Sequence, residues 1–125
     1  MKTTLSHRNE AMTLIGAFLI DFVTVDFESD GKIAKEILHE FQKNCNIDND
    51  DNRNFVLDSP IPSAGWYFAK LFLSGQFVKK LYELNSDQID NSKGKKFEDK
   101  FVYWLGIKFK IRKCEAHIKI ASEMK

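Results

Sequence analysis

The sequence has few cysteines and prolines and no long apolar run. Its two cysteines, Cys45 and Cys114, are far apart and belong to no CxxC pair. Isolated cysteines in a chain long enough to fold without cross-links are typical of free thiols, which predicts a reducing, cytoplasmic location. The most apolar stretch, residues 12–25, is interrupted by Asp21 and falls short of the roughly 20 residues that span a bilayer. The composition therefore predicts no membrane partner.

The sequence also lacks the motifs of common catalytic and metal sites. The six glycines form neither a GxGxxG nor a GxxxxGK frame, and no serine lies in a nucleophile elbow. His7, His39 and His117 lie far apart in the sequence and form no His pair at ligand spacing, so we expect no zinc site. The acidic segment 48–52 resembles the start of an EF-hand loop, but Arg53 stands where that loop requires glycine. We expect neither a metal nor a cofactor.

The chain does contain enough apolar material for one core, together with a charge asymmetry. Its 125 residues are 43% hydrophobic and 13% aromatic, which predicts a single domain over residues 1–125. The net charge is +1, but residues 1–62 carry six basic and eleven acidic side chains, whereas residues 63–125 carry thirteen and seven. This unequal distribution of charge favours a charged partner or packing of one half of the chain on the other. The basic binding candidates are Lys96, Lys100, Lys108, Lys110, Arg112, Lys113 and Lys119.

Apolar residues recur at three- and four-residue steps in four segments. This period predicts an all-α fold class, a four-helix bundle-like single domain with a long C-terminal helix. The predicted helices cover residues 6–25, 31–45, 64–84 and 97–125. Ser29 or Asp30 is a plausible N-cap of the second helix, and Gly75 favours a break or a close helix crossing in the third. The polar segments 44–54 and 85–96 are predicted to be loops.

The last predicted helix also has a competing interpretation. Its apolar stripe consists of Trp104, Ile107, Ile111, Cys114, Ile118 and Ala121. Within the same predicted helix, Ile107, Phe109 and Ile111 alternate with basic residues. This alternation would suit a short strand near 107–112, which gives an α+β fold as the alternative. A similar alternation of apolar and polar residues over 23–27 makes the end of the first helix ambiguous.

One pair of residues on the last predicted helix could carry chemistry. Arg112 and His117 are separated by four residues, which resembles the Arg-x4-6-His signature of the HEPN superfamily of small helical domains, many of which cut RNA as dimers. The resemblance implies that His117 transfers a proton near the scissile phosphate and that Arg112 stabilises the developing charge. Lys113 departs from the pattern, because that family usually has a polar uncharged residue, an acidic residue or His there.

Without another catalytic set, the sequence favours a non-enzymatic binding protein that docks on a protein partner or a nucleoprotein complex. Such proteins include toxin-neutralising immunity proteins, phage or bacterial inhibitors of nuclease complexes, and small assembly subunits such as those of CRISPR systems. The alternative is a HEPN-like RNA-cleaving or RNA-binding helical domain that uses Arg112 and His117. The basic C-terminal segment would then contact RNA, and a homodimer suits either function.

Overall fold

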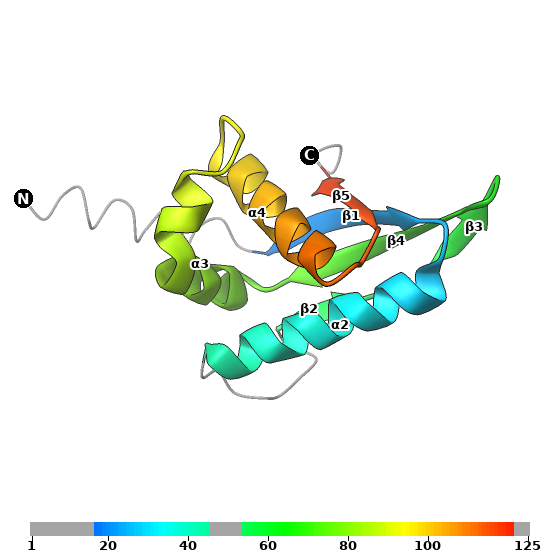
Figure 1. Ribbon diagram of the computed structural model, residues 1–125, viewed down its shortest axis with the longest axis horizontal. Coiled ribbons are helices and arrows are strands. Elements are labelled where there is room, and N and C mark those ends of the chain that lie inside the picture. Colours follow the sequence, from blue (N-terminus) through cyan, green and yellow to red (C-terminus); the bar gives the residue numbers. More distant parts are fainter. Residues whose placement is uncertain (1–16, 46–53, 122–125) are drawn as a thin grey trace, which may run out of the picture.

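The structure is a computed structural model that describes residues 17–45 and 54–121 (Figure 1). It is an α+β fold, so the predicted all-α four-helix bundle is wrong. Within these residues, a five-stranded sheet is combined with three helices. The elements in chain order are β1 (Phe18–Thr24), α2 (Phe27–Asn44), β2 (Phe55–Leu57), β3 (Ile61–Ser63), β4 (Trp66–Leu73), α3 (Gly75–Asp90), α4 (Phe97–Ile111) and β5 (His117–Ile120).

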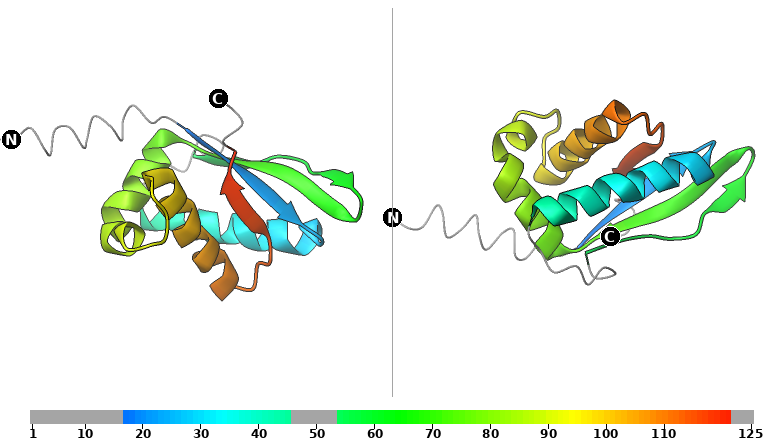
Figure 2. Two further views of the ribbon diagram at one scale, coloured as in Figure 1. Left: turned by 90° about the horizontal axis from the view of Figure 1, so that it is seen from above. Right: turned by 60° about the horizontal axis from the view of Figure 1, so that its bottom comes forward.

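The sheet has the strand order β2-β4-β1-β5, with β3 beside the other end of β4. All its pairings are antiparallel, and β4 and β1 are the central strands. With β2 and β3 taken as one interrupted strand, the elements follow the split β-α-β plan, in which α3 and α4 together replace the second helix. Figure 2 shows that α2, α3 and α4 all lie on the same side of the sheet.

Strand β1 replaces the end of the first predicted helix, whose earlier residues 6–16 lie outside the described part. Its side chains alternate, with Phe18, Ile20 and Phe22 buried against the helices and the residues between them more exposed. Because most residues of β1 are apolar on both faces of the strand, their spacing also matched a helical period. Pairing with β4 along the whole strand decides between the two.

Helix α2 confirms the second predicted helix, although it begins earlier than expected. Its N-cap is Asp26, whose side chain accepts a hydrogen bond from the backbone N–H of Ser29 at 3.2 Å. The predicted cap residues Ser29 and Asp30 lie inside the first turn instead. The helix ends at Asn44, and most of the predicted loop 44–54 that follows lies outside the described residues.

The third predicted helix is wrong in its first half, because residues 66–73 form β4. Ser74 separates strand from helix, and its hydroxyl accepts a hydrogen bond from the backbone N–H of Phe77 at 3.1 Å. Gly75 therefore lies at the first position of α3, where it breaks nothing. The helix continues through a kink at Asn85 to Asp90, which shortens the predicted loop 85–96.

The fourth predicted helix is too long, because α4 stops at Ile111 and β5 follows, and the last predicted residues, 122–125, lie outside the described part. The chain turns at Lys113, which has a φ of 69°, and the backbone N–H of Cys114 donates a hydrogen bond to the carbonyl of Phe109 at 2.9 Å. The buried face of α4 is also different from the predicted stripe, since Ile107 and Ile111 are 41% and 67% exposed. The alternative strand near 107–112 is wrong too, because these residues form the last turns of α4 and its C-cap.

The hairpin between β3 and β4 turns through Ala64 and Gly65, whose φ values are 53° and 85°. Positive φ at both central residues is the requirement of a type I′ turn, and it strains an alanine because of its Cβ. We expect Ala64→Gly to raise the free energy of unfolding by about 1 kcal/mol in urea denaturation. The matched change Gly65→Ala should lower it by a similar amount, and the opposite pair of signs would contradict this turn geometry.

Candidate functional site

The face of the sheet away from the helices is the candidate site, and we call it the open face. No helix of residues 17–45 and 54–121 packs on it (Figure 2). Its side chains come from alternate positions of the strands, opposite to those buried in the core. They are Leu19, Asp21 and Val23 of β1, Trp66, Phe68, Lys70 and Phe72 of β4, His117 and Lys119 of β5, and Val56 and Ile61 at the other edge.

Four charged residues form a row across the middle of the open face, which we call the charged row. In order across the sheet they are Asp58, Lys70, Asp21 and Lys119. Lys70 and Asp21 are directly opposite each other in the register of β4 and β1 and form an ion pair, while Lys119 is opposite Asp21 on its other side. The signs therefore alternate from one edge of the sheet to the other.

A bulge in the edge strand places Asp58 in this row. The backbone N–H of Asp58 donates to the carbonyl of Lys70 at 3.1 Å, and the backbone N–H of Lys70 donates to Oδ1 of Asp58 at 2.7 Å. Ser59 and Pro60 then stand opposite the single residue Ala69 before pairing resumes at Ile61. Proline is tolerated at such a bulge because no ladder hydrogen bond is required of it there.

A second row next to the charged row is mostly apolar, and we call it the apolar row. It runs Ile61, Phe68, Val23 and His117 across the sheet. Ile61 and Phe68 are 69% and 45% exposed, and the ring of Trp66 lies beyond them with its centroid 6.1 Å from that of His117. Both rows line one hollow of about 720 Å³. On the other side of the charged row, Val56, Phe72 and Leu19 form a second apolar row.

The structure does not bring Arg112 and His117 together. The guanidinium of Arg112 makes two hydrogen bonds to the carboxylate of Glu40 on α2, at 2.9 and 3.1 Å. The hydrogen bond from Arg112 lowers the pKa of the Glu40 carboxyl, and the same contact raises the pKa of Arg112. His117 is on the open face beside Trp66. The two side chains contact different elements and have different neighbours, so the geometry shows no common phosphate site.

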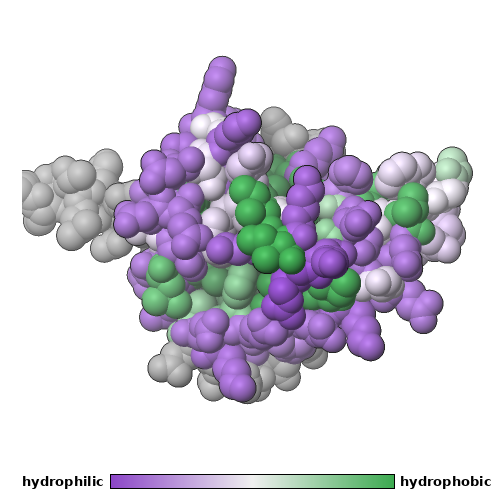
Figure 3. Space-filling model, in the orientation of Figure 1, coloured by the Kyte–Doolittle hydropathy of each residue, from purple (hydrophilic) through white to green (hydrophobic). Residues whose placement is uncertain are grey.

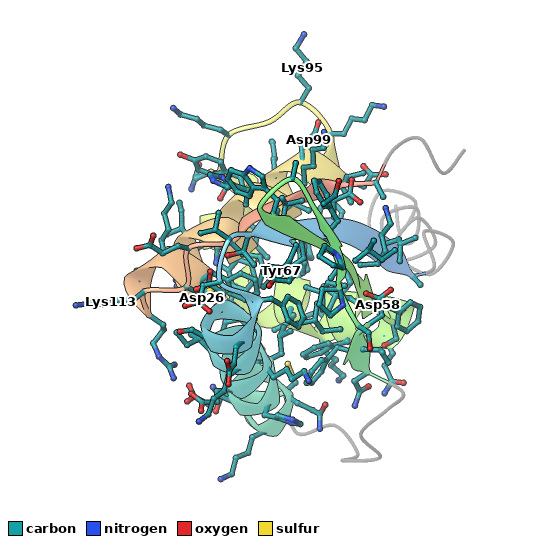
Figure 4. All side chains as sticks on the ribbon, turned by 90° about the vertical axis from the view of Figure 1, so that its right-hand side faces the viewer. Asp26, Asp58, Tyr67, Lys95, Asp99 and Lys113 are labelled. Atoms are coloured by element: carbon teal, nitrogen blue, oxygen red, sulfur yellow. The ribbon has the colours of Figure 1, made fainter. Side chains whose placement is uncertain are left out.

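The predicted basic binding residues are spread over several surfaces. Four of them lie along α4 or at its N-cap, namely Lys96, Lys100, Lys108 and Lys110, and Lys113 is in the turn after α4. The ammonium of Lys108 is 5.7 Å from the ring centroid of Trp104. Figure 4 shows Lys113 and Asp58 on opposite sides of the protein. Lys110 and Lys113 line a separate hollow of about 650 Å³ with His117. Of the seven predicted residues, Lys119 alone lines the hollow of the open face.

Most residues of the open face were missed by the sequence analysis, because 64–84 was interpreted as one helix. The local signal for a strand was weak, because Gly65 favours a turn but only Lys70 interrupts the apolar residues from Phe68 to Leu73. The aromatic content of this segment also suits a strand. Asp21 and Asp58 had no such signal, because their importance depends on strands that are paired across the sheet.

The two cysteines do not contribute a reactive group to the site. Both are free and buried. Burial raises the pKa of the Cys114 thiol to about 11 and also raises that of Cys45. Reactive cysteines have lowered pKa values, so neither residue is a nucleophile candidate.

Within the described residues, no cluster of three or more His, Cys, Asp or Glu side chains could hold a metal ion. The helices of the same residues are too short or too polar to cross a membrane. No family model, curated protein or solved structure matches this chain.

Proposed function

We propose that this chain is a non-enzymatic binding protein that docks on a protein partner through its open face. The observation that supports this most strongly is the row of exposed apolar side chains over the 720 Å³ hollow, with Ile61 69%, Phe68 45% and Trp66 39% exposed. Contiguous apolar side chains within a polar surround are typical of an interaction site. An immunity protein, an inhibitor and an assembly subunit would each use such a surface.

The charges of the open face favour a protein over RNA as the partner. Among the described residues, the open face has two lysines, and two carboxylates, Asp21 and Asp58, alternate with them in the charged row. RNA binding depends on an excess of positive charge along the phosphate backbone, and carboxylates in the centre of a site oppose it. Protein interfaces instead combine aromatic side chains with paired charges.

Strands give these side chains fixed positions before the partner arrives. Trp66, Phe68 and Val23 are on the two long central strands, which pair over seven residues. A rigid aromatic side chain with two rotatable bonds loses little entropy on binding, so it is a favourable anchor. We propose the cytoplasm as the compartment, because reducing conditions maintain Cys45 and Cys114 as free thiols.

Photocrosslinking tests the proposed surface. Phe68→p-benzoylphenylalanine, expressed in the host cell and irradiated, should give a covalent adduct with a protein. The matched control is Tyr103→p-benzoylphenylalanine on α4, because Tyr103 is 41% exposed but lies on the helical side. We expect at least about a tenfold higher yield at position 68, and loss of the adduct when Trp66→Asp is added. Equal yields at both positions, or an adduct with RNA, would contradict the proposal.

A further inference from the structure

We propose that the open face binds a second copy of this chain, so that two sheets pack face to face around a two-fold axis. This inference rests on the proposed function, because it names the partner of the same surface. The charged row carries the argument. A two-fold interface requires a surface that is complementary to itself, and the order of charges across a sheet determines which two-fold arrangement is favourable.

A two-fold axis parallel to the strands, between β4 and β1, reverses the order of strands in the second sheet. The row Asp58, Lys70, Asp21, Lys119 then meets the row Lys119, Asp21, Lys70, Asp58 of the second copy. Asp58 therefore meets Lys119 and Lys70 meets Asp21, and each pair occurs twice. All four positions of the row are opposite a residue of the other sign.

A two-fold axis perpendicular to the strands gives the opposite result. It preserves the order of strands, so that each member of the charged row meets its own copy when the axis lies along that row, and an axis displaced by one row would place the charges on apolar side chains. Asp58 would meet Asp58 and Lys119 would meet Lys119, which places four like-charged pairs in one interface. Like charges held together in an interface cost several kcal/mol, so this arrangement is excluded by repulsion. The charged row thus selects one dimer geometry as well as permitting it.

The apolar rows on both sides of the charged row fit the same axis. Phe68 meets Val23 of the second copy in one row, and Phe72 meets Leu19 in the other. These residues belong to the central strands, so the apolar contacts are in the middle of the interface. His117 meets Ile61 at the rim of the first row. Packed sheets are about 10 Å apart, a spacing at which side chains of this size touch across the gap.

In the described part of the chain, the side of the protein covered by the helices lacks such a row of alternating charges between apolar rows. In the view of that side its surface is mostly hydrophilic, with hydrophobic side chains along α4 (Figure 3). Ile107 and Ile111 are exposed there. The lysines of α4 include Lys108 and Lys110, while α2 contributes Glu36 and Glu40, of which Glu40 is already paired with Arg112. Self-association should therefore use the open face.

Charge reversal tests both the dimer and its axis. Light scattering at graded concentrations should give a mass of twice 14.5 kDa for the unmodified chain. Lys119→Glu and Asp58→Lys should each weaken self-association by about tenfold or more. An equimolar mixture of the two should restore the dimer, because each altered residue then meets an opposite charge. Lys110→Glu on α4 is the matched control and should leave the mass unchanged.

Asp58 also accepts a backbone hydrogen bond within the bulge, so Asp58→Lys could weaken the fold as well as the dimer. A second pair of variants therefore tests the dimer without changing Asp58. His117→Glu and Ile61→Lys change two exposed positions of the apolar row that the same axis brings together. Each single variant introduces one charge into an apolar contact, and their mixture should again restore the dimer. Circular dichroism confirms that each variant is folded before its mass is measured.

The outcomes separate this inference from the proposed function. A chain that stays monomeric at every concentration, or whose dimer is insensitive to both pairs of variants, overturns the second copy as the partner. Variants that weaken the dimer but give no recovery on mixing overturn the two-fold axis parallel to the strands. If Phe68→p-benzoylphenylalanine then forms an adduct with a different protein, the proposed function stands alone. If it forms an adduct with a second copy of the chain, both are supported.

Discussion

Phe22→Ala is expected to lower the free energy of unfolding by about 3–5 kcal/mol, out of the roughly 5–15 kcal/mol that stabilise a domain of this size. Phe22 is 0% exposed on the inner face of β1. Its ring makes edge contacts with Phe27 of α2 and Phe109 of α4, at centroid distances of 5.9 and 6.3 Å. Truncation therefore leaves a cavity where the sheet meets two helices, and urea denaturation at fixed protein concentration measures the loss.

The control is the next residue in the same strand. Val23 is half-buried and points to the open face, so Val23→Ala should cost less than about 1 kcal/mol at a protein concentration low enough for the chain to be monomeric. The comparison tests the side-chain alternation of β1 directly. In a strand, Phe22 and Val23 point to opposite faces of the sheet, which a helix over residues 6–25 would not require. Equal losses of stability for Phe22→Ala and Val23→Ala would therefore contradict the strand.

Asp30→Ala is expected to be the second large change, with a loss of about 2–4 kcal/mol. Asp30 is 5% exposed, and its carboxylate accepts hydrogen bonds from the buried hydroxyl of Thr24 and from the backbone N–H of Glu115 at 3.1 Å. Its backbone carbonyl also accepts a weak hydrogen bond from the Cys114 thiol, with Sγ 3.4 Å away. The residue joins the end of β1, the first turn of α2 and the turn before β5.

Two comparisons identify the cause of this loss. Glu28 is also an acidic residue in the first turn of α2 but is exposed, so Glu28→Ala removes the helix-dipole interaction alone, at a cost of up to about 1 kcal/mol. The double variant Thr24→Val with Asp30→Ala should cost less than the sum of the two single changes, because each single change leaves a buried partner unsatisfied. Additive losses would contradict the buried hydrogen bond.

Helical segments were predicted best, and for a local reason. Helix α2 was expected because Ile33, Ile37 and Leu38 recur at a helical period beside polar residues, all within one short stretch of chain. The start of α4 at Phe97 was also predicted. Its end was not, because the apolar period continues through Cys114 and Ile118 although the chain turns at Lys113. No glycine or proline near Lys113 indicates that turn in the sequence.

The strands were missed because both of their faces carry apolar side chains. In β1 and β4, the inner positions pack against the helices and the outer positions include Leu19, Phe68 and Phe72. A strand with one polar face shows a clear alternation, whereas one with apolar residues on both faces matches a helical period equally well. The same outer residues form the apolar rows, so the feature that concealed the strands also makes the open face a docking candidate.

The apolar content for one core, the position of α2 and the isolation of the two cysteines could be predicted from the sequence, because they depend on composition and on neighbours along the chain. The α+β fold and the charged row depend on tertiary pairing. That row joins Asp21, Asp58, Lys70 and Lys119, which are up to 98 positions apart and have no local pattern in common. Strand pairing places them side by side, and pairing between distant segments is a property of the whole folded chain.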